Sequence, residues 1–177
     1  VFNKIRNLIG GRVKSMVTGS APISADVLNF LKIAFCSPIF EGYGQTESSA
    51  ASCLTSGFDP VAGHVGGPLS CIRIRLKDIP EMNYLSTDET PRGEICYQGN
   101  SIFKGYYKNL EKTREALSED GWLASGDVGM VFPNGSVKII DRAKNIFKLS
   151  QGEYIAPEKL ENVYIQCPLV QQVYVYG

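Results

Sequence analysis

Three cations, Arg142, Lys144 and Lys148, lie close together on one short segment of the chain. A Gly-Glu turn at 152–153 follows them, and a helix is predicted to begin at Pro157, because proline suits the first helical position. A buried connection does not tolerate this much positive charge unless an anion lies nearby. The segment therefore indicates an anion-binding site, with a solvated basic loop as the alternative.

A second pattern combines glycines with groups that bind phosphate and metal ions. It runs from Glu41 to Ser48 and places Tyr43 between two glycines, followed by Thr46 and Glu47. Glycines beside an aromatic residue let the backbone approach a flat ligand closely. A hydroxyl next to a carboxylate suits a phosphate group and Mg²⁺. On spacing alone, an ordinary glycine-rich turn is the alternative.

A third pattern is a single acidic residue, Asp127, between Gly126 and Gly129. An aspartate in this setting can cap a turn, and an ionised carboxylate can also accept hydrogen bonds from two donors at once. Both interpretations stay open on the residues alone. Trp122, a little earlier, is predicted to pack in the core rather than to stack on a base, because buried aromatic residues mostly supply apolar area.

The elements that must position these residues begin with a strand, a helix and a second strand. Residues 12–18 are predicted to form a strand that ends at the loop Gly19-Ser20-Ala21-Pro22. Ser24 is a suitable N-cap for the helix that follows, and residues 38–43 are predicted to form the second strand. Open α/β sheets bind ligands at loops that follow strand C-terminal ends.

From about Gly66 onward the pattern changes to short alternating strands. Strands are predicted at 71–76 and 93–98, and a hairpin of 128–132 with 136–140 around Asn134-Gly135. Asn109 is a suitable cap for a helix through 110–117, and a last strand is predicted at 170–176. The predicted fold class is therefore mixed α/β: a βαβ segment, then a small antiparallel β unit, then the start of an α+β unit.

The motifs resemble those of the adenylate-forming (acyl-activating) superfamily. Tyr43-Gly44-Gln45-Thr46-Glu47 resembles its adenylate-binding motif, with the glycine loop at 19–22 at a fitting distance upstream. Gly126-Asp127 and Asp141-Arg142-Ala143-Lys144 resemble its ribose-binding and hinge segments. Residues 152–161 are most similar to the long-chain fatty acid acyl-CoA synthetases.

This resemblance implies a role for each matching residue. Thr46 would contact the α-phosphate of ATP, Glu47 would coordinate Mg²⁺ and Asp127 would accept hydrogen bonds from the ribose hydroxyls. Lys144 would be the pivot between two half-reactions, and with Lys148 it would neutralise phosphate charge. The implied catalytic residues are Thr46, Glu47, Lys144 and Lys148. The implied cofactor-binding residues are Gly19, Ser20, Ala21, Glu41, Gly42, Tyr43, Gly44, Thr46, Asp127, Arg142, Lys144 and Lys148.

The resemblance also implies a domain organisation. Residues 1–140 would form the C-terminal part of a large AMP-binding domain, with an α/β portion at 1–66 and a β-rich subdomain at 67–140. Residues 141–177 would form the hinge and the start of a small C-terminal domain. The family's phosphate-binding loop and distal C-terminal lysine are not found in these 177 residues. We therefore expect a fragment that is inactive alone.

The implied function is that of an ATP-dependent long-chain fatty acid–CoA ligase. Fatty acid, ATP and CoA would give acyl-CoA, AMP and diphosphate through an acyl-adenylate, with ATP, Mg²⁺ and CoA as cofactors or co-substrates. One alternative is an adenylate-forming enzyme for an aromatic acid or an amino acid. The other is a non-catalytic nucleotide-binding or interaction module.

Composition limits the other function classes. Lys plus Arg equals Asp plus Glu, so no overall field favours nucleic acid or an anionic membrane, and the expected partners are small-molecule substrates. No apolar run approaches the length of a membrane span, so membrane association of the full-length protein would need regions outside this chain.

The cysteines and the single histidine narrow the chemistry further. Five cysteines without a close pair are predicted to be reduced core residues of a cytosol-facing protein. Candidate locations of the full-length protein are the endoplasmic reticulum, the mitochondrial outer membrane and the peroxisome. His64 is the only histidine, which argues against a Cys/His zinc site and against most catalytic triads.

Overall fold

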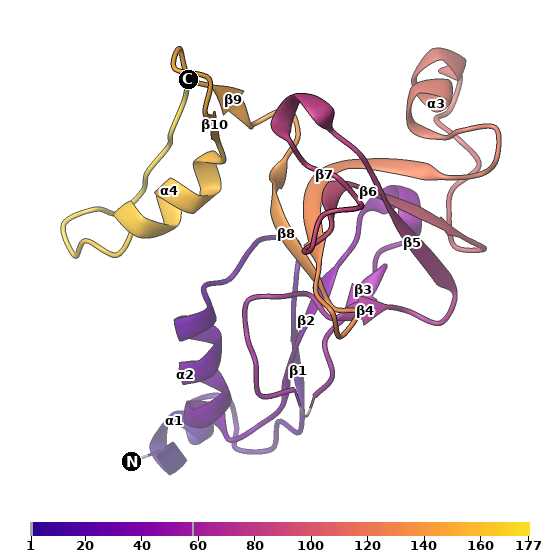
Figure 1. Cartoon of the computed structure of the whole chain (residues 1–177). Coiled ribbons are helices and arrows are strands. Elements are labelled where there is room, and N and C mark those ends of the chain that lie inside the picture. Colours follow the sequence, from indigo (N-terminus) through magenta and orange to yellow (C-terminus); the bar gives the residue numbers. More distant parts are fainter. Residues whose placement is uncertain (1, 58) are drawn as a thin grey trace.

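The computed structural model describes residues 2–57 and 59–177. It has two four-stranded sheets and a separate two-stranded hairpin. Figure 1 shows the first sheet with two helices beside it, the second sheet above, and two projections at the top, formed by α3 and by the β9–β10 hairpin. The mixed α/β class predicted from the sequence is confirmed.

The first sheet contains the predicted strand, helix and strand. β1 (Met16–Thr18) and β2 (Ile39–Tyr43) are parallel, with Thr18 opposite Glu41. The sheet is completed by β3 (Cys53–Leu54) and β4 (Gly67–Pro68), both paired antiparallel. β1 is shorter than the predicted strand at 12–18, because only three of its residues pair with β2.

Helix α2 (Ala25–Phe35) connects β1 to β2, and α1 (Phe2–Leu8) precedes β1. The predicted N-cap is confirmed, since Ser24 Oγ accepts a hydrogen bond from the N–H of Val27 at 3.3 Å. Leu28 and Ala34 bury the inner face of α2. The connection therefore returns the chain so that the ends of β1 and β2 lie side by side.

The second sheet is an antiparallel meander. Its strands are β5 (Ile72–Lys77), β6 (Arg92–Gly99), β7 (Leu123–Val131) and β8 (Val137–Arg142). Gly135 has a φ of 81° in the turn between β7 and β8, which explains why Asn134-Gly135 predicted this hairpin. A 3₁₀ turn, η2 (Pro80–Met82), lies between β5 and β6.

The β7–β8 pairing contains a bulge. Gly129 lies opposite Ile139, but Val128 lies opposite Asp141 and Asp127 opposite Arg142. Ile140 is therefore an extra residue on β8. The bulge brings Asp127 and Arg142 together as cross-strand neighbours.

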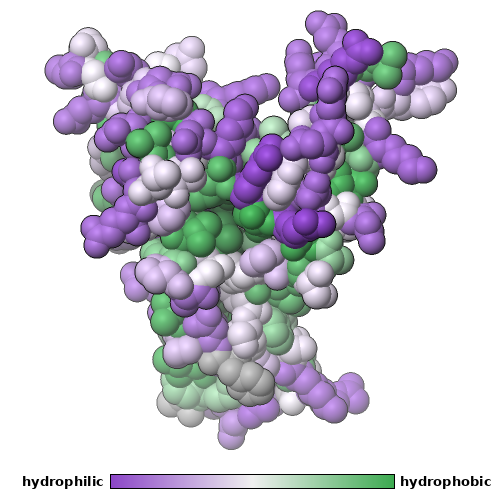
Figure 2. All heavy atoms as spheres, turned by 45° about the vertical axis from the view of Figure 1, so that its right-hand side comes forward, coloured by the Kyte–Doolittle hydropathy of each residue, from purple (hydrophilic) through white to green (hydrophobic). Residues whose placement is uncertain are grey.

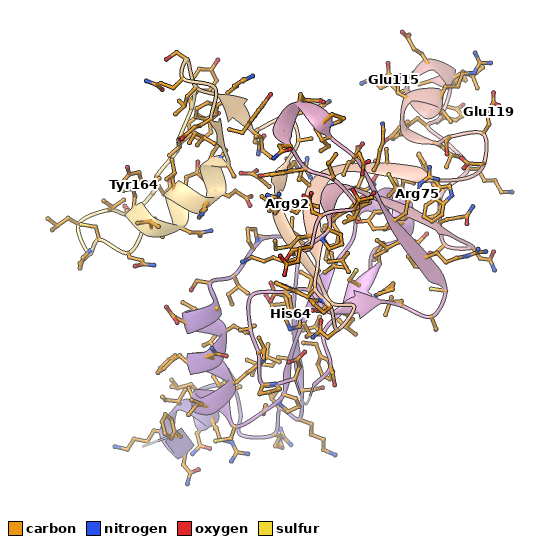
Figure 3. All side chains as sticks on the ribbon, in the orientation of Figure 1. His64, Arg75, Arg92, Glu115, Glu119 and Tyr164 are labelled. Carbon is orange, nitrogen blue, oxygen red and sulfur yellow. The ribbon has the colours of Figure 1, made fainter. Side chains whose placement is uncertain are left out.

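The core lies where the two sheets meet. It consists of the buried residues Cys53, Val65, Ile72, Ile95, Tyr97, Leu123 and Val137. Backbone hydrogen bonds from Val65 N to Val137 O and from Val137 N to Gly66 O, both 2.8 Å, tie the loop before β4 to β8. Figure 3 shows His64 at this junction, where its Nδ1 accepts from Gly66 N at 3.0 Å and its Nε2 lies 3.2 Å from Asp59 Oδ2.

The C-terminal part contains small elements. α3 (Leu110–Ala116) has the predicted cap, since Asn109 Oδ1 accepts from the N–H of Lys112 at 3.0 Å. β9 (Phe147–Lys148) and β10 (Tyr154–Ile155) form a hairpin around the predicted turn at 152–153, and α4 (Pro157–Tyr164) begins at the predicted proline.

The strand predicted at 170–176 is wrong. No residue there pairs in a ladder with any other described residue; the N–H of Val175 instead donates to Glu161 Oε1 at 2.8 Å. Alternating valine and tyrosine residues favour a strand, but a strand forms only where a partner strand supplies hydrogen bonds.

Two smaller predictions need correction. Cys53 and Cys96 are buried as expected, but Cys36, Cys71 and Cys167 are exposed. Trp122 is only half-buried and packs beneath Arg75, whose guanidinium carbon lies 4.3 Å from the centre of the indole ring.

Among the described residues, no helix has the length and apolar character that crossing a membrane requires.

Candidate active site

A cleft of about 1120 Å³ opens between the first sheet, the second sheet and α3. Its walls come from the C-terminal ends of β1 and β2, the loop before α3, the middle of β7, and the end of β8 with the turn after it. Figure 2 shows hydrophilic side chains on two upper projections and more hydrophobic surface between and below them. Stretches that are far apart in the sequence therefore meet at one cavity.

Most of the predicted site residues line this cleft. They are Gly19, Ser20, Gly42, Tyr43, Gly44, Thr46, Glu47, Arg142 and Lys144. Four others are not among the lining residues: Ala21, Glu41, Asp127 and Lys148. Asp127 lies directly behind the wall, because both of its side-chain partners line the cleft.

The glycines of the cleft bring backbone segments close together. A Cβ on Gly19 would lie 2.9 Å from the carbonyl oxygen of Gly42, and a Cβ on Gly44 would overlap the carbonyl oxygen of Ala50. No side chain fits at either position without a shift of the backbone. Gly19 and Gly44 thus have a packing cause in addition to the ligand-binding role that the sequence indicated.

Asp127 is the buried carboxylate of the site. It is 7% exposed, accepts a hydrogen bond from Tyr43 Oη to Oδ2 at 2.6 Å, and lies 3.5 Å through Oδ1 from Arg142 Nε. Burial raises the pKa of Tyr43, and the nearby Tyr97 and Asp127 raise it further. Tyr43 therefore stays protonated at neutral pH and donates to Asp127 in a short, charge-assisted bond.

Thr46 and Glu47 lie on a 3₁₀ turn, η1 (Thr46–Ser48), directly after β2. The turn is closed by Ser48 Oγ, which accepts from the N–H of Gln45 at 3.1 Å. Glu47 Oε1 accepts a hydrogen bond from Tyr106 Oη at 2.7 Å, and this bond is the main cause of the raised pKa of Tyr106. The Glu47 carboxylate is thus held at the cleft by a residue from another loop.

Glu41 lies beneath the cleft on β2 and is 8% exposed. Its Oε2 has no hydrogen-bond partner among residues 2–57 and 59–177. Burial raises the pKa of Glu41, while the charge of Lys32 acts in the opposite direction. The structure therefore places this predicted ligand below the cleft wall rather than on it.

The cationic segment begins at Asp141, which is 0% exposed. Its carboxylate accepts from Arg142 N at 2.7 Å, from Asn145 Nδ2 at 3.3 Å and from Glu158 N at 3.1 Å. The last bond joins the end of β8 to the first turn of α4. Asp141 therefore attaches the C-terminal helix to the second sheet.

The three cations of this segment do not all face the cleft. Arg142 and Lys144 line it, and both are exposed. Lys148 lies on β9, where its Nζ is 5.3 Å from the centre of the Tyr154 ring. Two of the three cations are therefore placed to meet an anion in the cleft, and the third packs on a neighbouring aromatic ring.

The side chains at Glu47 and Thr46 offer oxygen ligands of the kind that a magnesium ion binds. The described residues contain no group of three or more His, Cys, Asp or Glu side chains able to hold a metal. Glu47 supplies one carboxylate at the cleft beside the hydroxyl of Thr46. Mg²⁺ is usually held by one or two carboxylates together with substrate phosphates and water, so this donor set fits the ion.

Several cleft residues were missed by sequence reasoning. They are Gln45, Glu94, Tyr106, Lys112, Glu115 and Ser125. Figure 3 shows Glu115 on α3, away from the sheets. Tyr106 is far from Glu47 in the sequence, and no spacing rule connects the two residues. The only sequence signal is that Gly105-Tyr106 follows a predicted strand, where binding loops often occur.

The fold is shared with an enzyme domain that was solved in complex with AMP. The family model described as AMP-binding enzyme matches residues 3–107, more than half of the chain. The chain therefore belongs to the AMP-binding enzymes.

Relatives named for long-chain fatty acids match the chain over its whole length. Long chain acyl-CoA synthetase 7, peroxisomal, of Arabidopsis thaliana is 54% identical over 178 residues, covering 100% of this chain and 25% of that protein. Long-chain-fatty-acid–CoA ligase 5 of Rattus norvegicus is 55% identical over 177 residues, which cover 100% of this chain and 26% of that protein. The predicted resemblance to the long-chain fatty acid acyl-CoA synthetases is confirmed over the whole chain, and the chain spans about a quarter of the length of these relatives.

Solved structures agree with the fold. The A domain of carboxylic acid reductase from Segniliparus rugosus, in complex with AMP and a co-purified carboxylic acid, matches with a TM-score of 0.85 and 36% identity over 99% of this chain and 27% of that chain. O-succinylbenzoate coenzyme A synthetase from Bacillus subtilis, in complex with AMP, matches with a TM-score of 0.82 and 24% identity. The match covers 99% of this chain and 36% of that chain. The second likeness shows the fold alone.

Proposed function

We propose that this chain forms one wall of the active site of an ATP-dependent long-chain fatty acid–CoA ligase. The observation that carries the proposal is the convergence of separate motifs on one cleft, at 19–20, 42–47 and 142–144. Relatives at 54–55% identity that are named as long-chain synthetases or ligases support the substrate class.

The proposed domain organisation follows the motifs. Residues 1–140 would belong to the large AMP-binding domain, with its α/β portion at 1–66 and its β-rich portion at 67–140. Residues 141–177 would be the hinge and the start of the small C-terminal domain. The boundary would lie at the end of β8, where Asp141 bonds to the first turn of α4.

The proposed nucleotide site assigns the ribose to Asp127 and Arg142. The Asp127 carboxylate has four lone-pair positions, and Tyr43 occupies one of them. Enough acceptor capacity remains for ribose hydroxyls, because Arg142 approaches only at 3.5 Å. The adenine would lie along the backbone at Gly19, Gly42 and Gly44, which carry no side chains.

The proposed first step is attack of the fatty acid carboxylate on the α-phosphate of ATP, with pyrophosphate leaving. Negative charge builds on the α-phosphate, so cations fixed beforehand lower the barrier. Arg142 and Lys144 are the hinge cations on the cleft, and the Thr46 hydroxyl lies on the same wall. No protein nucleophile is needed, which is consistent with a chain whose single histidine is buried away from the cleft lining.

Mg²⁺ would bind at Glu47, and when bound it would neutralise phosphate charge as a Lewis acid. Glu47 and Thr46 then hold the phosphate end of the nucleotide, while Asp127 holds the sugar. These two anchor points come from different sheets, since Thr46 and Glu47 lie on η1, which follows β2, and Asp127 lies on β7. The cleft therefore fixes both ends of the nucleotide and leaves the α-phosphate between them.

The proposed second step is attack of the CoA thiol on the acyl carbonyl, with AMP leaving. Rotation of the C-terminal part about Lys144 would exchange the surface that faces the substrate between the two steps. Lys148 lies off the cleft in the present arrangement. Its proposed contact with phosphate would therefore belong to a rotated arrangement.

The location of the whole protein is also a proposal. Relatives include peroxisomal synthetases of Arabidopsis thaliana. We propose a cytosol-facing ligase at the peroxisome, the endoplasmic reticulum or the mitochondrial outer membrane, held there by regions outside these residues.

The substrate is tested with the whole protein that carries this chain. Purified protein, ATP, Mg²⁺ and CoA are incubated with labelled palmitate, coumarate or an amino acid, and thioester formation is followed. We expect thioester with palmitate at a rate at least tenfold above the other acids. Equal or greater activity with coumarate or an amino acid would reject the long-chain assignment.

The hinge is tested by comparing Lys144→Pro with Lys144→Ala in the same protein. Both variants remove the charge, but only proline restricts backbone rotation. We expect Lys144→Pro to lose the acyl-transfer step, measured from supplied acyl-adenylate and CoA, much more than Lys144→Ala does. Acyl transfer at the wild-type rate in Lys144→Pro would show that the pivot is elsewhere.

A further inference from the structure

Tyr106 contacts Glu47 from a loop that the motifs did not include. Its hydroxyl donates to Glu47 Oε1 at 2.7 Å, and the side chain also lines the cleft. Tyr106 is 38% exposed, so it is a cleft-wall residue and not part of the core. The contact therefore acts on the orientation of a carboxylate rather than on core packing.

The loop that carries Tyr106 is attached to the Glu47 turn at two further points. The N–H of Phe103 donates to the carbonyl oxygen of Glu47 at 2.8 Å, and Ser49 Oγ donates to Ser101 O at 2.7 Å. With the Tyr106 bond, three hydrogen bonds join the segment 101–106 to the turn at 47–49. The segment 101–106 thus holds both the main chain and the carboxylate of Glu47.

The Tyr106 ring is itself held in place. It packs edge-on against Phe103, with ring centres 4.9 Å apart and ring planes at 76°. Its backbone N–H donates to Thr113 Oγ1 at 2.9 Å, which ties the loop to α3. The hydroxyl therefore meets Glu47 from a fixed direction, and little side-chain entropy is lost when the bond forms.

We propose that Tyr106 is a positioning residue, which holds the Glu47 carboxylate in one orientation at the cleft so that a divalent cation meets a preformed ligand. The proposal rests on the proposed function, in which Glu47 binds the ion. An ionised carboxylate has about four acceptor positions, so one bond from Tyr106 leaves room for a cation. A ligand held in advance binds more tightly because less ordering is required on binding.

The test measures metal binding directly, with Mn²⁺ as the probe and α,β-methylene-ATP as a nucleotide that is not cleaved at the α-phosphate. Free Mn²⁺ is counted by electron paramagnetic resonance in the whole protein. We expect Tyr106→Phe to raise the Mn²⁺ dissociation constant about tenfold, at the lower end for a hydrogen bond to a charged group. Tyr107→Phe is the matched control, because Tyr107 is adjacent and 87% exposed, and it should leave the constant unchanged.

A double-mutant cycle separates positioning from a general effect on the loop. In a Glu47→Gln background, Tyr106→Phe should cause no further loss of Mn²⁺ affinity, because the carboxylate that it orients is gone. The affinity for the nucleotide without metal should be the same in wild type and Tyr106→Phe, which also shows that the cleft is intact.

Three results would overturn the inference in different ways. If wild type binds Mn²⁺ with the nucleotide and Tyr106→Phe binds it within twofold of wild type, the positioning role is wrong while the proposed function stands. If wild type binds neither nucleotide nor Mn²⁺, the proposed function fails and the inference fails with it. An equal loss from Tyr106→Phe in the Glu47→Gln background would assign the effect to the loop and not to Glu47.

Discussion

Replacing Asp141 by asparagine tests how the C-terminal segment is attached to the second sheet. The carboxylate is 0% exposed and accepts three hydrogen bonds, two on Oδ1 and one on Oδ2. Asparagine keeps the shape of the side chain but has only one acceptor oxygen. Its NH₂ group, itself a donor, would face one of the N–H donors that now bond to the carboxylate. At least one bond is therefore lost, and one partly buried donor is left without a partner.

The expected cost follows from these contacts. A hydrogen bond to a charged group contributes about 1.5–3 kcal/mol, and an unpaired buried donor costs about 1–3 kcal/mol. We expect Asp141→Asn to lower the free energy of unfolding by about 2–3 kcal/mol. Asp141→Ala removes all three bonds, and we expect a loss of about 3–5 kcal/mol.

The assay is urea unfolding followed by circular dichroism, together with hydrogen exchange at the Glu158 amide. The free energy of unfolding falls by about 2–3 kcal/mol per molar urea for a protein of this size. The loss expected for Asp141→Asn therefore lowers the urea concentration at the unfolding midpoint by about 1 M. Exchange at Glu158 should be faster, because its N–H loses its acceptor. Asp120→Asn is the control, since that side chain is 62% exposed and should change stability by less than about 0.5 kcal/mol. An Asp141→Asn variant as stable as the control, with unchanged exchange at Glu158, would refute the reasoning.

Three further predictions concern the cleft. Tyr43→Phe removes the 2.6 Å hydrogen bond to Asp127. In a pyrophosphate-release assay it should raise the KM for ATP about tenfold, with a smaller change in kcat. An unchanged KM would argue against a role of Asp127 in nucleotide binding. Burial raises the pKa of Glu41 above its ordinary value of 4.5, so its contribution favours folding below pH 4.5 and is lost as the pH rises through the raised pKa. Glu41→Gln should therefore raise the Tm at pH 7 and leave it unchanged near pH 4, and a lower Tm at pH 7 would contradict this sign. Gly44→Ala places a methyl group against the carbonyl oxygen of Ala50 and should lower the free energy of unfolding by about 3 kcal/mol in urea, whereas a change below about 0.5 kcal/mol would show that the turn adapts.

Local signals in the sequence predicted the elements well. Ser24 and Asn109 each cap a helix through one hydrogen bond to a nearby N–H, and Asn134-Gly135 closes a hairpin. These signals work because donor and acceptor are within a few residues of each other. The strand at 170–176 failed for the opposite reason, since strand formation depends on a partner that local sequence does not specify.

The site was predicted in part, because the motif residues carry a family resemblance but their partners do not. Nothing in the sequence connects Tyr43 to Asp127 or Glu47 to Tyr106, and both bonds join different parts of the fold. The position of Lys148 away from the cleft also depends on the pairing of β9 with β10. Tertiary contacts of this kind are set by register and packing rather than by spacing along the chain.

The bulge at Ile140 determines which charge faces Asp127. With a regular ladder continued from the Gly129 and Ile139 pair, Asp141 would lie opposite Asp127, and two carboxylates would repel each other across the strands. The one extra residue places Arg142 there instead and leaves Asp141 free to bond α4. A register in which Ile140 paired with Val128 would thus replace attraction by repulsion beside Asp127 and turn the Asp141 carboxylate away from α4. The single extra residue therefore sets both the charge opposite Asp127 and the attachment of the C-terminal helix.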